Sequence, residues 1–269
     1  MLKFIPTPIG NPQDITIRAL REFEQASLFL CEDTRNTKKL LDILAQRFEF
    51  TIPNAQFLSF HEHNGKERLK EVASRLESEN VVYVSDAGMP IISDPGQILV
   101  EYCQKEGIEY DILPGANALL VAYSASGFDS GKFLFWGFLP HKGSNRSSEL
   151  SKVLNMQVDV ILYESLHRIE KLISEIVDID NTRELFLAKE LTKKFQKYYK
   201  GTAREILDKF KTINLKGEWV VVIRAKENQD KVLYLEDILK LDIAPKVKAK
   251  ILSKLTDKTT KEWYKELIG

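Results

Sequence analysis

The residues that follow the apolar run Val81–Val84 carry the clearest chemical signal in the sequence. Ser85, Asp86 and Gly88 begin a loop of turn formers and short polar side chains that extends to Gly96. An aspartate just past a buried strand can accept hydrogen bonds from a ribose or an amine, and a glycine lets the backbone approach a flat ligand. Because open α/β sheets bind ligands outside the carboxyl ends of their strands, these residues predict a small-molecule site at one edge of a sheet.

Other apolar runs in the first half of the chain end in loops of the same kind. A single loop of this type is usually an ordinary turn. A series of them indicates a shared site, because the strand ends of a doubly wound sheet meet at one edge. The five loops are Thr7–Pro12, Glu32–Arg35, Ser59–Asn64, Asp86–Gly96 and Pro114–Asn117.

Several common catalytic motifs are absent from the sequence. It contains no G-x-x-x-x-G-K-[ST] loop, no G-x-G-x-x-G after the first strand and no G-x-S-x-G elbow, which argues against the usual nucleotide hydrolases, dinucleotide enzymes and serine hydrolases. His61 and His63 could ligate a metal from one loop, but no third ligand is near them in the sequence. We therefore expect no metal site.

Apolar runs alternate with helical patterns over the first part of the chain, which favours a parallel sheet with flanking helices. The helices expected include Lys66–Glu79, Asn117–Ser126 and Thr202–Phe210. The strands expected are Leu2–Pro6, Ala26–Cys31, Gln56–Ser59, Val81–Val84 and Glu109–Leu113, then Phe133–Phe138, Val158–Tyr163, Glu184–Leu187 and Trp219–Ile223.

A change of pattern near Leu113–Gly115 predicts a domain boundary. We expect an α/β fold of two α/β domains. The first, at 1–114, has a mostly parallel sheet with flanking helices, and the second, at 115–227, has a mixed sheet. The residues at 228–269 lose the strand pattern and form a lysine-rich helical tail.

The composition is that of an ordinary globular protein. The chain has 269 residues, 43% of them hydrophobic and 29% charged, and its formal net charge is zero. Binding to nucleic acid would therefore depend on a local basic patch. The only cysteines are Cys31 and Cys103, and neither a signal peptide nor a membrane span is expected, so a cytoplasmic location is predicted.

Seven motifs in this order are similar to those of the tetrapyrrole-methylase-like superfamily of S-adenosylmethionine enzymes. Within it, the sequence most resembles the enzymes that methylate the 2′-oxygen of a cytidine in the decoding region of 16S ribosomal RNA. The motifs are Thr7–Asn11, Cys31–Arg35, Ser59–Asn64, Ser85–Pro90 with Ser93–Gly96, Leu113–Ala118, Tyr163–Arg168 and Glu190–Lys194.

The resemblance implies that S-adenosylmethionine lies in a cleft between the two domains, held largely by backbone groups, in a homodimer. The positions that match cofactor contacts are Pro8, Ile9, Gly10, Asp86, Gly88, Met89, Asn117, Ala118 and Leu166. Other roles stay open for three of them. Asp86 could form a turn or a cap, Asn117 could cap a helix as well as contact the cofactor, and Leu166 could pack in a core.

The resemblance also implies methyl transfer, which requires the acceptor oxygen, the methyl carbon and the sulfur to be held in line. A ribose hydroxyl is a poor nucleophile, so a base or a nearby cation would help. We expect Glu190 and Lys193 to form a site pair, with a solvated ion pair as the alternative. The candidates at the cleft are Asp33, Arg35, Glu62, Glu164, His167, Glu190 and Lys193; the catalytic set that we favour is Glu190, Lys193, Glu164 and Arg35.

Lysines and aromatic residues recur together late in the chain, at Lys193–Arg204, and the tail adds more lysines. Lysines meet phosphates and aromatic rings stack on unpaired bases, so this mixture suits RNA, although it also suits a solvated surface. We expect 16S ribosomal RNA or the small ribosomal subunit as partner. The alternatives are a methylase of a small tetrapyrrole and a non-catalytic RNA-binding protein with the same fold.

Overall fold

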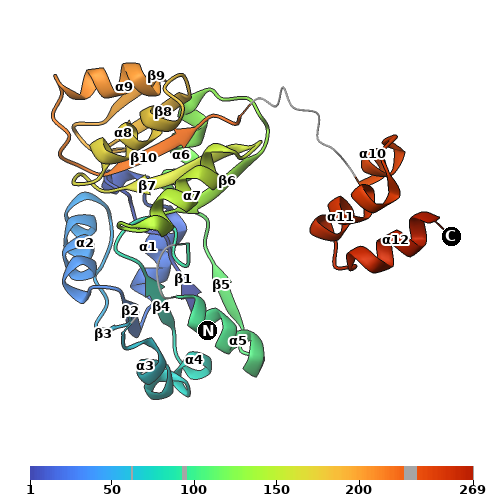
Figure 1. Ribbon diagram of the computed structural model, residues 1–269. Helices are drawn as coiled ribbons and strands as arrows, with labels where there is room; N and C mark the ends of the chain where they lie inside the picture. The colour runs from blue at the N-terminus through green and yellow to red at the C-terminus, as the bar shows by residue number, and fades with distance from the viewer. Residues whose placement is uncertain (62, 93–95, 227–234, 269) are drawn as a thin grey trace. The chain divides into compact units, whose positions relative to one another are not determined.

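The computed structural model describes residues 1–61, 63–92, 96–226 and 235–268. The chain divides into two compact units, Met1–Lys226 and Glu227–Gly269. The first unit contains two sheets with their helices, and the second is a small helical unit (Figure 1). The domain boundary that we expect near residue 114 lies inside the first unit and stays a prediction.

The first sheet is parallel throughout, as the alternating pattern predicted. Its strands are β1 (Leu2–Phe4), β2 (Leu28–Cys31), β3 (Gln56–Ser59), β4 (Val81–Val84) and β5 (Tyr110–Ile112). They lie in the order β3-β2-β4-β1-β5. Each pair of neighbours is parallel, so the loops after these strands meet at one edge.

Helices cover both faces of the first sheet. Helices α1 (Ile17–Glu24) and α2 (Thr34–Arg47) pack on the face that carries Phe29 and Val82. Helices α3 (Gly65–Val72), α4 (Arg75–Ser78) and α5 (Gln97–Glu106) pack on the other face. The chain therefore leaves β1 toward one face and β4 toward the other. Because these two strands are neighbours, their carboxyl ends form the switch point where such sheets bind ligands.

Two local details of the first half bear on the sequence predictions. Thr16 caps α1 by accepting a hydrogen bond from the backbone N–H of Ala19 at 3.0 Å. The structure divides the expected helix Lys66–Glu79 into α3 and α4. Ala73 and Ser74 lie between the two helices and keep right-handed helical dihedral angles. A short 3-10 helix, η1 (Pro12–Asp14), follows the first loop.

The second sheet is mixed. Its strands are β6 (Phe133–Gly137), β7 (Asp159–Glu164), β8 (Glu184–Lys189), β9 (Lys197–Thr202) and β10 (Trp219–Ile223). They lie in the order β6-β7-β10-β8-β9, with β6 parallel to β7 and the other neighbours antiparallel. The carboxyl ends of β6, β7 and β8 therefore meet the beginning of β10 at one edge of this sheet.

Strand β9 was not among the predicted strands. It is an edge strand with three lysine or glycine positions in six residues, so it lacks the apolar run that marks the other strands. Its extended state depends on pairing with β8, whose residue Ala188 lies opposite Tyr198.

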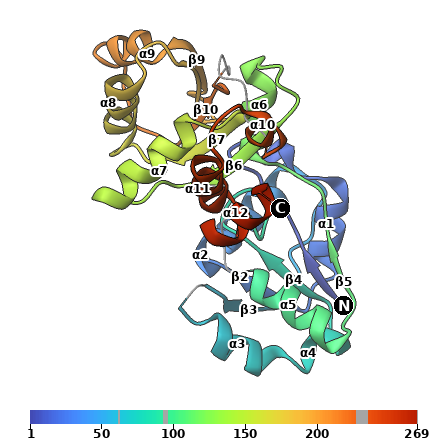
Figure 2. The ribbon, with the colours of Figure 1, turned by 45° about the vertical axis from the view of Figure 1, so that its right-hand side comes forward.

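Helix α6 (Ala118–Ser126) packs on one face of the second sheet, against Ile161, Phe186 and Val222. Helices α7 (Ser144–Leu154), α8 (Ile169–Ile179) and α9 (Ala203–Phe210) cover the other face, as Figures 1 and 2 show. The face with α6 also carries Ile9, a residue from the loop after β1. The two halves of the first unit thus share one apolar cluster.

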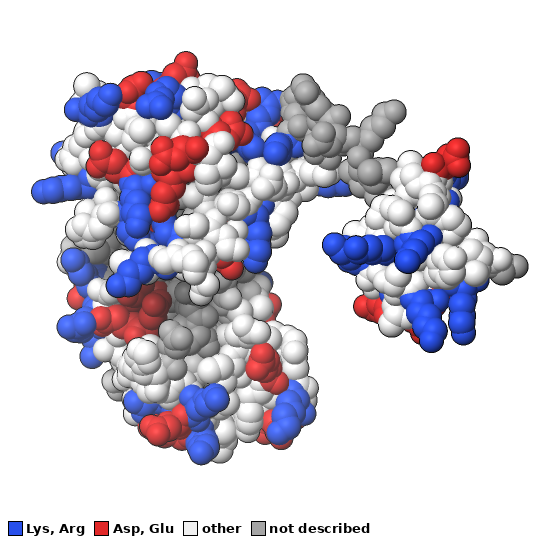
Figure 3. All heavy atoms as spheres, in the orientation of Figure 1, with Lys and Arg blue, Asp and Glu red and all other residues white. Residues whose placement is uncertain are grey.

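The helical unit contains α10 (Leu235–Lys240), α11 (Pro245–Leu255) and α12 (Thr260–Ile268). Its small core consists of Ile238, Ala249, Leu252 and Trp263, and Pro245 begins α11. Figure 3 displays separate lysine side chains on one face of this unit, among uncharged residues. Within the described residues of the whole chain, every helix is too short or too polar to cross a bilayer.

Candidate functional site

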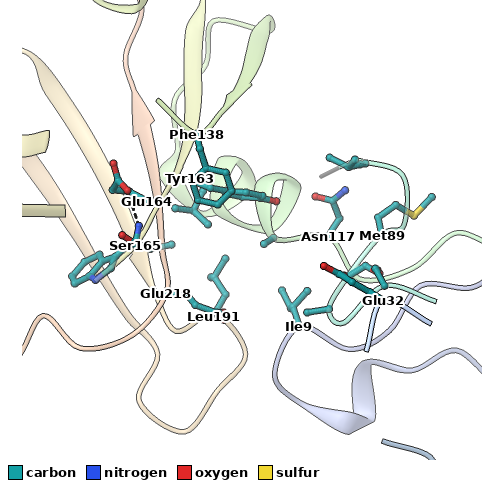
Figure 4. Close-up of a pocket in the computed structure, with 18 residues that line it drawn as sticks. Ile9, Glu32, Met89, Asn117, Phe138, Tyr163, Glu164, Ser165, Leu191 and Glu218 are labelled. Carbon is teal, nitrogen blue, oxygen red and sulfur yellow. Dashed lines mark hydrogen bonds between the residues drawn. The ribbon is translucent and has the colours of Figure 1, made fainter. Parts of the chain in front are cut away.

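A cavity of about 340 Å³ lies where the loops after the first sheet face the second sheet. Figure 4 shows Ile9, Glu32 and Met89 on one side of it and Tyr163, Leu191 and Glu218 on the other. Its lining residues are Ile9, Glu32, Ser85, Ala87, Gly88, Met89, Ile92, Asn117, Ala118, Phe138, Tyr163, Glu164, Ser165, Ala188, Leu191, Glu218, Trp219 and Val220.

The loops after the first sheet contribute backbone and small side chains to this cavity, beside the larger Ile9, Glu32 and Met89. Thr7 and Gly88 form a two-way antiparallel bridge, with both N–H to carbonyl distances at 3.0 Å, which ties the loop after β1 to the loop after β4. Gly88 has a φ of +80°, and a Cβ built on it would lie 3.0 Å from Cγ2 of Ile9. The position therefore requires glycine for its dihedral angle and for space.

Asn117 both caps a helix and lines the cavity. Its Oδ1 accepts a hydrogen bond from the backbone N–H of Leu120 at 3.2 Å, at the start of α6. The side chain of Asn117 is labelled beside Met89 in Figure 4. The capping role expected as an alternative is therefore confirmed, and it leaves the amide nitrogen on the same side chain for a ligand.

The second sheet contributes large side chains. Phe138 and Tyr163 form an aromatic wall, with ring centroids 5.7 Å apart. Burial raises the pKa of the Tyr163 phenol, so this group stays protonated at neutral pH and can donate a hydrogen bond.

Glu164 is buried at the end of β7 between two arginines. Its Oε1 accepts a hydrogen bond from the Ser165 backbone N–H and forms an ion pair with Nε of Arg168, both at 2.8 Å. Its Oε2 lies 3.7 Å from Nη1 of Arg146, which is itself buried and pairs with Glu175 at 2.8 Å. Oε2 of Glu164 and Nη2 of Arg146 are buried without a hydrogen-bond partner among the described residues. The carboxylate is therefore held in place and keeps one oxygen that can still accept a hydrogen bond.

The arginines also hold the chain next to Phe138. Nη1 of Arg146 donates to the carbonyl of Pro140, and Nη1 of Arg168 donates to the carbonyl of Leu139, each at 3.1 Å. The charged cluster thus fixes the segment that carries the aromatic wall.

Glu190 and Lys193 form the expected pair, with Nζ of Lys193 at 3.1 Å from Oε1 of Glu190. The same Nζ lies 2.8 Å from Oε2 of Glu218, which lines the cavity. Partial burial raises the pKa of Glu190, but hydrogen bonds from the Glu218 backbone and from Lys193 outweigh it, and the net pKa is lowered. Burial acts to lower the pKa of Lys193, but its bonds to Glu218 and Glu190 outweigh it and raise the pKa. Both groups are therefore charged at neutral pH.

The turn that carries this pair joins the two halves of the first unit. Glu190 and Thr192 both have positive φ angles, +51° and +61°, which non-glycine residues adopt at a cost. Oγ1 of Thr192 accepts a hydrogen bond from the Asn11 backbone N–H at 3.0 Å. A Cβ built on Gly10 would lie 2.4 Å from Cγ of Lys193. Gly10 thus approaches the second half closely, and the turn is held by contacts from both halves.

The cavity wall is acidic. Glu32, Glu164 and Glu218 line it, whereas its lining within the described part of the chain includes neither lysine nor arginine. Glu164 and Glu218 form ion pairs with arginine or lysine side chains that lie outside the cavity lining. A wall of carboxylates and apolar groups is complementary to a ligand that carries positive charge.

Six of the predicted site residues line the cavity: Ile9, Gly88, Met89, Asn117, Ala118 and Glu164. Seven others lie beside it or away from it: Pro8, Gly10, Asp86, Leu166, Arg35, Glu190 and Lys193. The cofactor and catalytic roles of all of them stay predictions.

The residues outside the cavity lining have defined positions. Asp86 accepts hydrogen bonds from the Asp33 backbone N–H at 3.2 Å and from Asn36 Nδ2 at 2.7 Å, so it ties its loop to the start of α2. The side chain of Arg35 is 88% exposed and pairs with Asp33, whose pKa it lowers to about 2. Leu166 is 39% exposed and is therefore not a core residue. Glu62, Ser93, Asp94 and Pro95 lie outside the described residues.

The site residues that the sequence predictions missed come mostly from the second sheet. Phe138 and Ser165 directly follow β6 and β7, so a search of strand ends in this half would have found them, whereas Ala188 lies inside β8 and Trp219 begins β10. Within the described residues, His61 and His63 belong to no group of three or more potential metal ligands.

Comparison with known proteins identifies relatives along the full chain. Residues 1–207 match the family described as Tetrapyrrole (Corrin/Porphyrin) Methylases. A protein of Helicobacter pylori (strain ATCC 700392 / 26695) named ribosomal RNA small subunit methyltransferase I is 43% identical, over 98% of this chain and 96% of that protein. A protein of the same name from Campylobacter fetus is 44% identical over 100% of both chains.

The fold is that of solved methyltransferases. The structure of uroporphyrin-III C-methyl transferase from Thermus thermophilus, complexed with S-adenosyl homocysteine, aligns with a TM-score of 0.55 at 14% identity, over 82% of this chain and 96% of that one. At this identity the likeness concerns the fold alone. The family match and the full-length relatives show that the chain belongs to the tetrapyrrole methylases and, within them, to the ribosomal RNA small subunit methyltransferase I family.

Proposed function

We propose that this protein transfers a methyl group from S-adenosylmethionine to the 2′-oxygen of a cytidine ribose in 16S ribosomal RNA. The observation that carries the proposal is the cavity at the switch point of the first sheet, in a chain whose full-length relatives are named ribosomal RNA small subunit methyltransferase I. The 2′-oxygen and the cytidine are proposed as the target because the sequence motifs resemble those of enzymes with this target.

The residues of the cavity fit the cofactor. A volume of about 340 Å³ is in the range of small-ligand sites. Ile9, Met89 and Ala118 offer apolar contacts, and Gly88 leaves the backbone accessible where a Cβ would fill the space. The acidic wall suits the positive charge of a sulfonium compound. We assign cofactor contact to these residues and to Asn117, whose amide nitrogen can donate to the ligand.

Bound S-adenosylmethionine supplies an electrophilic methyl carbon, so the protein mainly has to orient the acceptor and exclude water. The aromatic wall of Phe138 and Tyr163 limits the space on the side of the second sheet. Lys193 stays protonated beside Glu218 and reduces the cost of negative charge developing on the acceptor oxygen. Tyr163 stays protonated as well and acts as a hydrogen-bond donor rather than as a base.

The test is incubation of the full chain with S-adenosylmethionine labelled in its methyl group and either 30S subunits or naked 16S ribosomal RNA. We expect label in RNA and, after digestion to nucleosides, in 2′-O-methylcytidine. Label in a different nucleoside would contradict the assigned target. Label only in an added uroporphyrinogen-type tetrapyrrole would favour the small-molecule alternative, and RNA binding with no transfer would favour the non-catalytic one.

We further propose a cytoplasmic homodimer. RNA as substrate and two free, buried cysteines support the location. Exposed apolar side chains on α6, Leu120 and Val121, support a contact between copies. Sedimentation of the purified chain tests the assembly, and a monomer at micromolar concentration would contradict it.

A further inference from the structure

We propose that Lys194, Phe195, Lys197 and Tyr198 form a binding surface for unpaired RNA nucleotides that flank the target. We call these four residues the β9 surface. The proposal rests on the proposed function, because it names where the RNA chain lies once the target nucleotide occupies the cavity.

The β9 surface continues directly from the cavity wall. Ala188 lines the cavity, and Tyr198 lies opposite it in the register of β8 and β9. Because opposite residues in a sheet point to the same face, the Tyr198 ring lies on the cavity side of the second sheet, one strand further out. Phe195 lies in the connection between β9 and the turn that carries the Glu190–Lys193 ion pair.

Both rings are accessible to solvent. Phe195 is 67% exposed and Tyr198 is 45% exposed. The Tyr198 ring contacts Phe186 on one side, with centroids 5.4 Å apart, and its hydroxyl accepts a hydrogen bond from Gln196 Nε2 at 3.0 Å. The Oε1 atom of the same glutamine accepts from the Thr192 backbone N–H at 2.6 Å. Tyr198 is therefore held in place by the turn that borders the cavity, which reduces the entropy that binding would cost.

Three other aromatic or basic residues of this segment are already engaged. Tyr199 points to the opposite face and packs on Trp219, with centroids 5.8 Å apart. Lys200 donates to the Ser126 carbonyl at 2.9 Å and lies over the Phe128 ring. Lys193 is bound by two carboxylates. The structure thus separates the residues of Lys193–Arg204 that the sequence pattern grouped together.

The charge of the β9 surface matches a phosphate backbone. Lys194 and Lys197 are exposed, and neither forms an ion pair with a residue that the structure describes. Nζ of Lys194 lies 5.6 Å from the centre of the Phe195 ring. Rings that stack on bases, interspersed with cations that meet phosphates, are the means by which proteins bind single-stranded nucleic acid.

The experiment measures the affinity of the full chain for an unstructured single-stranded RNA oligonucleotide by fluorescence anisotropy. We expect Phe195→Ala and Tyr198→Ala each to raise Kd roughly 5- to 100-fold, the usual effect of losing one base-stacking ring. We expect Lys194→Gln and Lys197→Gln each to make the dependence of log Kd on log salt shallower by about 0.7. The affinity for S-adenosylmethionine, measured by calorimetry, should not change in any of these variants.

Phe133→Ala is the matched control. Phe133 is 40% exposed on β6, the other edge strand of the same sheet, and packs against one aromatic ring, as Tyr198 does. Its removal should leave RNA affinity unchanged. Wild-type RNA affinity in both ring variants, or an equal loss in Phe133→Ala, would overturn the β9 surface. Absence of methyl transfer by the wild-type chain would instead refute the proposed function, and the affinity series would still decide on the surface.

Discussion

The two sheets build opposite sides of one cavity by different means. The loops after the first sheet bring closely packed backbone to the cavity, such as the bridge between Thr7 and Gly88, beside apolar side chains such as Met89. The second sheet presents rings and carboxylates, such as Tyr163 and Glu164, which are held by packing and by ion pairs. Ligand binding by the first wall therefore depends on how closely the backbone can approach the ligand. Ligand binding by the second wall depends on side chains that their neighbours hold in place.

This difference predicts different sensitivities to mutation. In the first half an added methyl group should harm ligand binding, because the space is bounded by backbone. In the second half a lost charge should harm stability or turnover, because buried charges depend on their partners. The four predictions below test this contrast, from the largest expected effect to the smallest.

We expect Arg146→Met to lower the free energy of unfolding by about 3 kcal/mol, since it removes the buried cation that lies beside Oε2 of the buried Glu164. Arg146 is 2% exposed and contacts both Glu164 and Glu175. Urea unfolding monitored by circular dichroism measures the loss. The control is Lys171→Met, because Lys171 also pairs with Glu175, at 3.8 Å, but is 54% exposed. It should cost less than about 0.5 kcal/mol. Equal losses in the two variants would show that burial of the charge cluster does not matter.

We expect Gly88→Ala to weaken S-adenosylmethionine binding about tenfold or more, because the new Cβ would lie 3.0 Å from Ile9 in the cavity wall. Gly107→Ala is its control. Gly107 has a similar φ of +70° but open space around its Cα, at the end of α5. Both variants should lose about 1–2 kcal/mol of stability from the dihedral angle alone. Calorimetry separates the two effects, and unchanged affinity in Gly88→Ala would remove Gly88 from the cofactor site.

The first sheet and its loops could be predicted from sequence because each parallel strand is a short apolar run that ends in small polar residues. Ile9, Gly88 and Asn117 follow such runs directly, and the structure places all three in the cavity lining. The edge strand β9 could not be predicted, since it is strand only by pairing with β8.

The wall from the second sheet was harder to predict for a physical reason. Ala188 and Trp219 have the sequence pattern of core residues, and only the antiparallel pairing of β10 with β7 and β8 brings them to the cavity. That pairing joins segments that are distant in sequence. Asp86 shows what sequence position cannot give: its place after a strand predicts a ligand contact, which stays a prediction, and only the structure shows that its carboxylate is hydrogen-bonded to the start of α2.

We expect Lys193→Met to lower kcat roughly tenfold while the affinity for S-adenosylmethionine is unchanged, since the cation supports charge on the acceptor oxygen. The Lys193→Arg variant should recover part of the rate. Glu190 has a pKa below its usual value and Lys193 a pKa above its usual value, so the pair stays charged from pH 6 to 9 and the wild-type rate should not titrate through it there. A wild-type kcat in Lys193→Met would show that the ion pair between Glu190 and Lys193 has only a structural role.

The smallest effect is expected for Asp86→Ala. Its carboxylate makes two hydrogen bonds to the start of α2, so its removal should loosen the loop and weaken S-adenosylmethionine binding only about three- to tenfold. The Asp86→Asn variant keeps an oxygen that accepts from the Asp33 backbone N–H, but its amide nitrogen cannot accept from Asn36 Nδ2. Its affinity for S-adenosylmethionine should therefore lie between that of Asp86→Ala and that of the wild type. A loss of more than about a hundredfold in Asp86→Ala by calorimetry would mean that the carboxylate contacts the ligand directly. In that case a charged side chain of the first half, and not the close approach of its backbone, would dominate the affinity, and the contrast between the two walls would no longer hold.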